Sequence, residues 1–462
     1  MASAKASPAE LGSKKISSLL KDYAVPAIIA MTASSLYNMV DSIFIGHGVG
    51  PLAISALGVC FPLTNLSTAF GTLVGVGAST MLSVLLGQKN YEGANKVLGN
   101  IVSMNTIIGL MFMAVALIWL DEILGFFGAT ENTLPYAREY MKIILYGNVV
   151  THLYFGLNGA MRSGGNPRFA MRLTLMTVIL NTVLDPVFIF VFGMGVQGAA
   201  IATVLAQVVA LVIIMKAFAD KTRAIHFEKG IFRFNWTIAK DSIQVGMGPF
   251  LMNSAACLVN LFLNQQLLRY SGDLGIGAYG IVHRISFLFV MVVMGLNQGM
   301  QPISGYNYGA RQYSRVKEVY ILTVKWAVAV TSVGFICSEL FPTLMCRAFT
   351  SDTQLLELSA KGLRLINIIF PLVGFQMVST NFFQSLGMVG KSIFLSLSRQ
   401  LLFLIPCAYL LPLALGAGGV WLSFPASDFI SCGITFAMIV SLMKKFNRLK
   451  DGDDPSILGS KL

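Results

Sequence analysis

The sequence predicts an all-α polytopic membrane protein in which twelve transmembrane helices form two pseudo-symmetric six-helix bundles. Three observations predict this fold class: an apolar composition, a one-sided distribution of basic residues and an internal repeat. Of the 462 residues, 55% are hydrophobic and only 12% are charged, whereas a soluble globular chain carries about 25% charged residues. The mean hydropathy of +0.72 agrees with this. We therefore expect most of the chain to lie in a lipid bilayer.

Twelve apolar stretches are long enough to cross a bilayer as helices, which takes about 20 residues each. The first six are expected at 16–45, 54–85, 95–120, 137–161, 170–193 and 198–218. The second six are expected at 241–268, 277–306, 316–341, 360–386, 392–413 and 419–443. The domains expected from these spans are an N-terminal tail (1–15), an N-lobe (16–218), a cytoplasmic linker (219–239), a C-lobe (240–445) and a C-terminal tail (446–462).

The basic residues predict the orientation of these helices. With the N-terminus inside, the cytoplasmic loops and tails hold 24 Lys and Arg residues and the outer loops hold 4, which is the bias of the positive-inside rule. We therefore expect a multi-pass protein of the cell (inner or plasma) membrane with both termini in the cytoplasm. The net charge of +12 then requires no nucleic-acid partner. The polar first twenty residues resemble a retained tail more than a signal peptide.

The two halves of the chain repeat each other at an offset of 222 residues. The stretch "GPLAISALG" (50–58) aligns with "GDLGIGAYG" (272–280), and Gly77 aligns with Gly299. Because each half has an even number of helices, both halves enter the membrane from the same side. Their symmetry axis then lies along the membrane normal, as in transporters built from two helical bundles.

Two acids in apolar spans of the first half have no counterpart in the second. They are Asp41, in "SSLYNMVDSIFIGHGVG" (34–50), and Asp185, in "LNTVLDPVF" (180–188). The sequence thus concentrates its intramembrane acids in the first half. Ionisable residues inside a membrane are costly and are by default candidates for a functional site.

Helix rise places four polar residues of the N-lobe in one layer. At about 1.5 Å per residue, Asp41 lies ~8 Å, Asp185 ~12 Å and Thr203 ~8–9 Å below the outer ends of their spans. Asn181 shares a helix face with Asp185, since the two are four residues apart. Their oxygens could hold a hard cation such as Na+, or the two carboxylates could share a proton. Alternatively, each acid caps a kink or satisfies one neighbour.

Pro26 and Pro249 fall at matching points of the first and seventh predicted helices. Prolines inside helices commonly produce ordinary kinks, and that interpretation suffices for both. A functional alternative is a bend of the first helix at Pro26 whose angle depends on the state of Asp41.

At these residues the sequence resembles the multidrug and toxic compound extrusion (MATE) transporters, over roughly 16–445. The motif "P…YNMVDSIFIG" and the two six-helix lobes carry the resemblance, which is nearest to the DinF-like and MepA-like bacterial members. It implies H+ or Na+ coupling at Asp41, Asn181, Asp185 and Thr203. It also implies that the N-lobe cavity is lined by Tyr37, Asn38 and Asn158. NorM-type members carry acids in helices 7 and 10, but 242–269 and 363–386 contain none here.

The resemblance implies export of bulky, often cationic, organic compounds in exchange for H+ or Na+, by alternating access. We expect a monomer in the bilayer that takes small-molecule substrates and needs no cofactor. The six cysteines include no C-x-x-C pair, so neither a disulfide framework nor a zinc site is indicated. The near-match "GMGVQG" (193–198) has its counterpart in "LGAGG" (415–419), and "SLGMVGKS" (385–392) repeats the turn "SGGNPR" (163–168). Neither stretch therefore indicates a nucleotide site.

Two other functions stay open at this point. A lipid or lipid-linked oligosaccharide flippase would share the two-lobe architecture, and Arg284 favours it weakly, but its cavity should be basic and not acidic. An intramembrane enzyme could use two aspartates, yet no D-D-x-x-D, H-E-x-x-H or G-x-S-x-G motif is present. We therefore expect a transporter and not an enzyme.

Overall fold

The computed structural model describes residues 8–228, 230 and 234–458. Throughout these residues the secondary structure is helical, and they contain no strand. The chain forms two compact units. One comprises Met1–Ser13 and Ile29–Phe250, and the other comprises Lys14–Ile28 and Leu251–Leu462.

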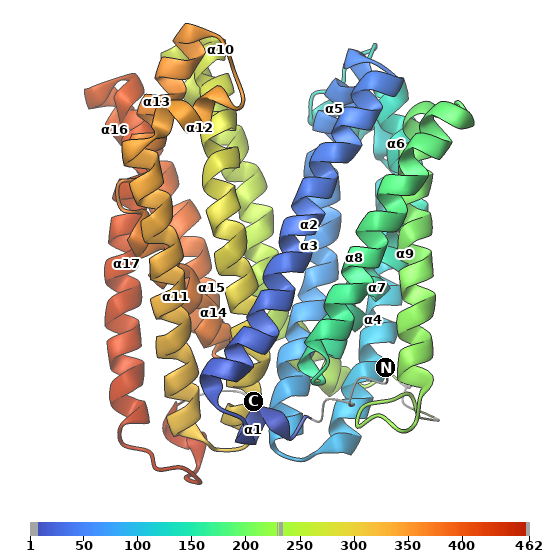
Figure 1. The fold of residues 1–462 in the computed structure, drawn as a ribbon, viewed down its shortest axis with the longest axis vertical. Coiled ribbons are helices and arrows are strands. Elements are labelled where there is room, and N and C mark those ends of the chain that lie inside the picture. The colour runs from blue at the N-terminus through green and yellow to red at the C-terminus, as the bar shows by residue number, and fades with distance from the viewer. Residues whose placement is uncertain (1–7, 229, 231–233, 459–462) are drawn as a thin grey trace. The chain divides into compact units, whose positions relative to one another are not determined.

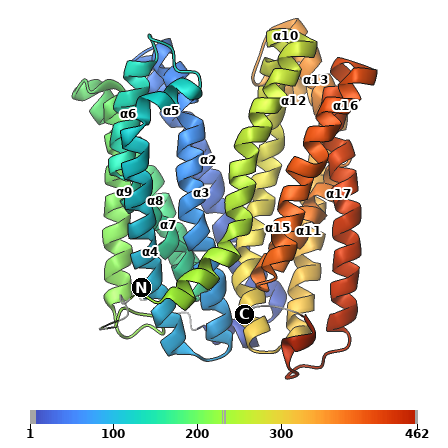
Figure 2. The same cartoon turned by 180° about the vertical axis from the view of Figure 1, so that it is seen from behind.

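The helices of the first half follow one another with short connections (Figures 1 and 2). They are α1 (Glu10–Ser13), α2 (Ile16–Gly48), α3 (Pro51–Gly87), α4 (Tyr91–Ile118), α5 (Leu120–Phe126), α6 (Leu134–Tyr146), α7 (Asn148–Ser163), α8 (Pro167–Pro186), the π-helix η1 (Val187–Val191) and α9 (Gly195–Ala219).

The second half repeats this order after a linker. Its helices are α10 (Trp236–Gly309), α11 (Tyr313–Leu340), α12 (Pro342–Arg347), α13 (Thr353–Asn367), α14 (Phe370–Ser385), α15 (Val389–Leu397), the π-helix η2 (Ser398–Leu404), α16 (Ile405–Leu415), α17 (Ala417–Phe446) and the 3-10 helix η3 (Pro455–Leu458). Gly272, at φ 62°, breaks α10 into two helices.

Each of the twelve predicted spans is helical. Among the described residues, ten helices are long and apolar enough to cross a membrane, and α13–α14, bent by 53°, makes an eleventh. The remaining predicted span, 137–161, consists of α6 and α7. Each of these two helices is short, and the buried Asn148 and His152 make this stretch more polar than the others. The prediction of an all-α membrane protein is confirmed.

Helix boundaries recur at the offset found in the sequence. Helices α4 and α11 begin at Tyr91 and Tyr313, 222 residues apart, and α9 and α17 begin at Gly195 and Ala417. The left-handed backbone positions recur as well, in the pairs Gly50 and Gly272, Lys89 and Arg311, and Gly165 and Gly387. The compact units follow the same offset. Residues 14–28 belong to the unit formed mainly by the second half, and their equivalents, 236–250, belong to the unit formed mainly by the first half. The predicted lobe boundaries at 218 and 240 stay a prediction.

Small residues allow close helix contacts in the first unit. A Cβ added to Gly75 of α3 would lie 3.2 Å from Gly156 Cα of α7. Further along α3, a Cβ on Gly77 would lie 1.9 Å from Ser242 O, so the backbones of α3 and the start of α10 are in direct contact. Small residues at helix interfaces allow such close contact between membrane helices.

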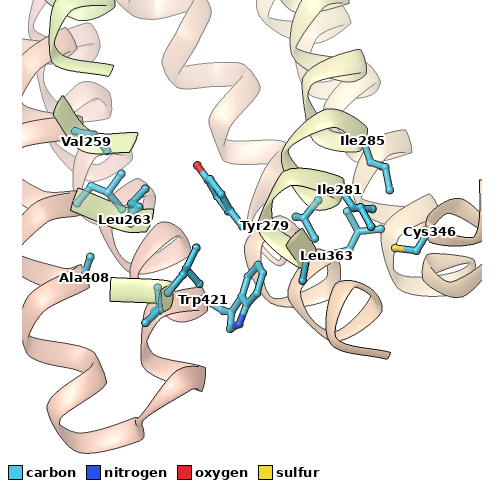
Figure 3. Close-up of a cluster of buried hydrophobic side chains, with 14 residues drawn as sticks. Val259, Leu263, Tyr279, Ile281, Ile285, Cys346, Leu363, Ala408 and Trp421 are labelled. Carbon is cyan, nitrogen blue, oxygen red and sulfur yellow. The ribbon is translucent and has the colours of Figure 1, made fainter. Parts of the chain in front are cut away.

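The core of the second unit is aromatic and aliphatic (Figure 3). Tyr279, Leu363 and Trp421 are buried in one cluster with Leu263. Gly362 makes room for this cluster, because a Cβ there would lie 2.6 Å from the Trp421 ring. Packing of α13 and α17 around the second helix of α10 therefore fixes the position of Tyr279.

Candidate cation-coupling site

The side chain of Asp185 is placed by an irregular stretch of helix. Pro186 follows it directly and donates no backbone hydrogen bond, and the π-helix η1 begins at Val187. Single-turn π-helices inside α-helices occur frequently at functional sites. The exposed fraction of Asp185 is 0%, so the carboxylate lies inside the first unit and not toward lipid.

Thr203 of α9 connects α2 to α8. Its Oγ1 accepts a hydrogen bond from Asn181 Nδ2 at 3.2 Å and shares another with the Tyr37 hydroxyl at 3.2 Å. Three of the predicted residues therefore meet at one oxygen, from three different helices. The prediction that helices 1, 5 and 6 bring these residues to the same depth agrees with these contacts.

Asp41 completes a group of buried oxygens. We use the name acidic cluster for Asp41, Asn181, Asp185 and Thr203. Asp41 is 9% exposed and Asn181 is 2% exposed. No hydrogen-bond donor in the described part of the chain reaches Asp41 Oδ1, Asn181 Oδ1 or either carboxylate oxygen of Asp185. Leaving a buried acceptor without a donor costs about 1–3 kcal/mol, and more for a charged group.

Two tyrosines lie within electrostatic range of both acids. The charge of Asp41 acts on Asp185, and both carboxylates act on the phenol groups of Tyr37 and Tyr140. Tyr140 of α6 was not among the residues predicted from the sequence. Nothing in the sequence of α6 (Leu134–Tyr146) alone marks it.

The acidic cluster offers oxygen atoms alone toward its unpaired positions. Carboxylate and amide oxygens are the ligands of hard cations, and a carboxylate also accepts a proton. The cluster therefore fits Na+ or H+ chemically. It does not fit a soft metal, and the described residues contain no group of three or more His, Cys, Asp or Glu side chains that could hold one.

The three residues predicted to line the substrate cavity differ in the contacts that the structure gives them. Tyr37 is tied to the acidic cluster through Thr203. Asn158 of α7 donates from Nδ2 to Ala170 O of α8 at 3.2 Å, so it joins α7 to the helix that carries Asn181 and Asp185. The side chain of Asn38 lies outside the residues that the structure describes. Pro26 is buried in α2 and its predicted functional bend stays a prediction.

The expectation that intramembrane acids are concentrated in the first half was incomplete. Asp428 lies in α17, within the predicted span 419–443, and its side chain is 9% exposed. Its Oδ1 accepts a hydrogen bond from Arg399 Nε of η2 at 2.6 Å. No sequence pattern joins these two charges, because they are 29 residues apart on different helices.

A network of buried polar side chains in the first unit was also not predicted from the sequence. The hydroxyl of Ser67 in α3 donates to Asn148 Oδ1 and also bonds His152 Nε2, both from α7. His152 Nε2 lies 2.9 Å from the carbonyl oxygen of Ser67 as well. All three are buried. This network holds α3 against α7 and lies on helices other than those of the acidic cluster.

Comparison with known proteins decides the family. The MatE family profile matches residues 26–187 and 249–410, one match in each half of the repeat and together most of the chain. The chain belongs to the MATE family.

Relatives of this MATE protein are named as multidrug exporters. It is 28% identical to the "Multidrug export protein MepA" of Staphylococcus aureus (strain MSSA476) over 422 residues, which cover 91% of this chain and 93% of the relative. The protein of the same name from Staphylococcus haemolyticus (strain JCSC1435) is 25% identical over 423 residues, 92% of this chain and 93% of the relative. The MepA-like resemblance is thereby confirmed.

Solved structures confirm the MATE fold. An outward-facing multidrug resistance MATE family transporter of the MOP superfamily superimposes with a TM-score of 0.90, at 24% identity, over 97% of this chain and all of the other. A MOP superfamily transporter from Pyrococcus furiosus Vc1 gives 0.89 at 25% identity, over 96% and 100%. MATE structures have twelve helices in two lobes, as the sequence predicts for this chain.

Proposed function

We propose that this protein is a secondary active antiporter that exports bulky organic compounds, cations among them, in exchange for H+ or Na+. The multidrug export proteins among its relatives support the class of substrate. The acidic cluster supports the coupling. We place the protein in the cell membrane as a monomer with both termini in the cytoplasm, in line with the distribution of its basic residues.

One observation carries the proposal for coupling. The acidic cluster brings together buried oxygens from α2 and α8 that receive no hydrogen bond from the described protein groups. Two neighbouring carboxylates in a medium of low dielectric strongly disfavour carrying two negative charges. A proton or a Na+ ion removes this penalty, and the two sites titrate as one unit. Binding and release of one cation therefore changes the energy of this lobe.

Exchange follows if the cation and the organic compound favour different states of the same lobe. A ligand shifts a conformational equilibrium only by its differential affinity for the two states. The unpaired oxygens give a cation such an affinity, because they are satisfied only when it is bound. Tyr37 transmits the change, since its hydroxyl contacts Thr203 of the cluster and its helix carries Asp41.

The test measures currents from purified protein in liposomes, with Na+ and pH gradients applied separately. Wild type should respond to one of the two gradients, and Asp41→Asn should abolish that response together with dye export. The response to a single gradient identifies the coupling ion. Glu122→Gln is the matched control, because it also removes one carboxylate but at an exposed position outside the acidic cluster.

Folding is checked by the same purification, in which Asp41→Asn should give a monodisperse protein with wild-type yield. Normal ion-driven dye export by folded Asp41→Asn would refute coupling through the cluster. Transport of an anionic lipid by wild type, with no drug-dependent ion flux, would replace the antiporter by a lipid flippase.

A further inference from the structure

Two lysines of the second unit lie together at the helix ends that we place in the cytoplasm. Lys391 is in the first turn of α15, and Lys445 is in the last turn of α17. The charge of Lys445 acts on the Lys391 ammonium. Neighbouring like charges repel each other, so an anion that binds both ammonium groups relieves an unfavourable contact.

The Lys391 ammonium has weak partners among the described residues. Its Nζ lies 3.9 Å from the thioether sulfur of Met388 and 5.5 Å from the centroid of the Phe383 ring. A thioether is a weak acceptor, and a ring face holds a partly exposed ammonium only weakly. Within the described part of the chain, no carboxylate forms an ion pair with Lys391. Its positive charge is therefore available to an anionic ligand.

The repeat shows that packing at this position does not require a second cation. At the offset of 222, Lys445 aligns with Arg223 and Lys391 aligns with Phe169. In the first half the Arg223 guanidinium lies over the Phe169 ring, 5.4 Å from its centroid. The same place thus holds a cation and a ring in the first half, but two cations in the second half.

An apolar groove leads away from these lysines along α15 and η2. It has a volume of about 370 Å³ and runs from Gly390 past Phe394 and Leu397 to Leu402, with Ser398 as a polar residue in its wall. From residue 390 to residue 402 the helical rise amounts to ~18 Å, which is close to half of the ~30 Å hydrocarbon core of a bilayer. The groove therefore begins beside Lys391 and has the length of an acyl chain in one leaflet.

Gly390 keeps the end of the groove next to Lys391 open. A Cβ added to Gly390 would meet no described atom within 4 Å. At the offset of 222, Gly390 aligns with Arg168 and Phe394 aligns with Arg172, and both arginines are exposed. The matching face of the first half is therefore charged where that of the second half is apolar.

We propose that Lys391, Lys445 and this groove form a binding site for an anionic phospholipid of the cytoplasmic leaflet. The phosphate diester binds both ammonium groups, and one acyl chain lies in the groove between Gly390 and Leu402. Basic pockets between membrane helices on the cytoplasmic side are suited to anionic lipid headgroups. The lipid is a bound partner of the second unit and not an exported compound, so the site does not rest on the proposed antiport.

The test counts the lipids bound to the full-length protein in detergent by native mass spectrometry. Phosphatidylglycerol and phosphatidylcholine with identical acyl chains are titrated separately, and the Kd values of the first bound lipid are compared. Wild type should bind phosphatidylglycerol about 25-fold more tightly, which corresponds to ~2 kcal/mol from two lysines near an anionic lipid. Lys391→Gln and Lys445→Gln should each reduce this preference about fivefold.

Two control variants separate the site from general surface effects. Lys444→Gln removes an exposed charge directly beside Lys445 and should keep the wild-type preference. Gly390→Leu fills the end of the groove without changing any charge and should abolish the tight binding of phosphatidylglycerol. Gly433→Leu is its control, because this exposed glycine of α17 also has no described atom within 4 Å of an added Cβ, and it should bind both lipids as wild type does.

Four results would overturn the proposal. One is a wild type with no preference for phosphatidylglycerol, and another is an equal loss of preference in Lys444→Gln and Lys445→Gln. Unchanged phosphatidylglycerol binding by folded Gly390→Leu would exclude the groove. Displacement of the lipid by an equal concentration of its soluble headgroup, glycerophosphoglycerol, would assign the lysines to a soluble phosphate compound. Because binding is measured without an ion gradient, failure of the proposed antiport leaves all of these results unchanged.

Discussion

Substituting Gly77 by alanine should destabilise the protein, because α3 touches the start of α10 through bare backbone. An alanine Cβ at this position would lie 1.9 Å from Ser242 O, 2.8 Å from Ser242 C and 2.9 Å from Gly246 N. The same contact excludes a side chain from the other helix, since a Cβ on Gly246 would lie 1.7 Å from Leu73 O. No flexible side chain is available to move aside, so a helix must shift.

The size of the effect follows from this geometry. Ordinary carbon–oxygen contacts lie above about 3 Å, so one helix backbone must move by roughly 1 Å. Overpacking of this kind costs about 1–3 kcal/mol. Intrinsic helix propensity opposes it, because alanine is better than glycine in a helix interior by about 0.5–1 kcal/mol. We therefore expect a net loss of about 1 kcal/mol.

The assay is thermal unfolding of the detergent-purified protein, in which size-exclusion chromatography measures the folded fraction that remains after heating. Gly58→Ala, in the same helix, is the matched control: a Cβ there meets no described atom within 4 Å, so this variant should be as stable as wild type or slightly more so. A Gly77→Ala protein as stable as Gly58→Ala would refute the close backbone contact.

Two further predictions follow from individual contacts. Thr203→Ala removes the oxygen shared by Tyr37 and Asn181. The cation concentration for half-maximal transport current should rise about fivefold, as expected for the loss of about 1 kcal/mol. Thr203→Ser should restore the wild-type concentration, and a wild-type value for Thr203→Ala would contradict the contact. In the C-terminal tail, partial burial raises the pKa of Asp451, but hydrogen bonds from Ser314 and Tyr313 lower it by more. The pKa of Asp451 therefore lies below its ordinary value. The attachment of the tail should therefore hold above the ordinary aspartate pKa of about 4 and weaken as the pH falls through the lower, native value. Hydrogen exchange at the Ser314 amide measures it, and Asp451→Asn, exchanging no faster than wild type at neutral pH, would contradict it.

Most of the fold could be predicted from the sequence. Hydropathy locates spans because a membrane helix needs an unbroken apolar stretch, and this requirement acts on consecutive residues. The 222-residue offset predicted recurring boundaries, and Tyr91 and Tyr313 begin equivalent helices. The span at α6 and α7 was harder to delimit, because its polar residues, such as His152, are satisfied by α3 and not by their own helix.

The acidic cluster could be predicted in part. Depth along a helix follows from residue number, which is why Asn181 and Thr203 were expected to be neighbours. Rotation about the helix axis and the packing of neighbouring helices do not follow from it. Tyr140 was missed for that reason, since nothing in α6 alone shows that its phenol lies within electrostatic range of Asp41 and Asp185.

The sequence by itself determined the membrane class, the number of helices, the duplicated halves and the two acids, Asp41 and Asp185, that have no counterpart at the repeat offset. Each of these follows from local composition or from a constant spacing. Only the tertiary structure decided which side chains meet. It joined Thr203 to Tyr37 and Asn181, and it paired Arg399 with Asp428. Such contacts depend on how helices distant in the chain rotate and pack against one another, and no periodicity within a single helix contains that information.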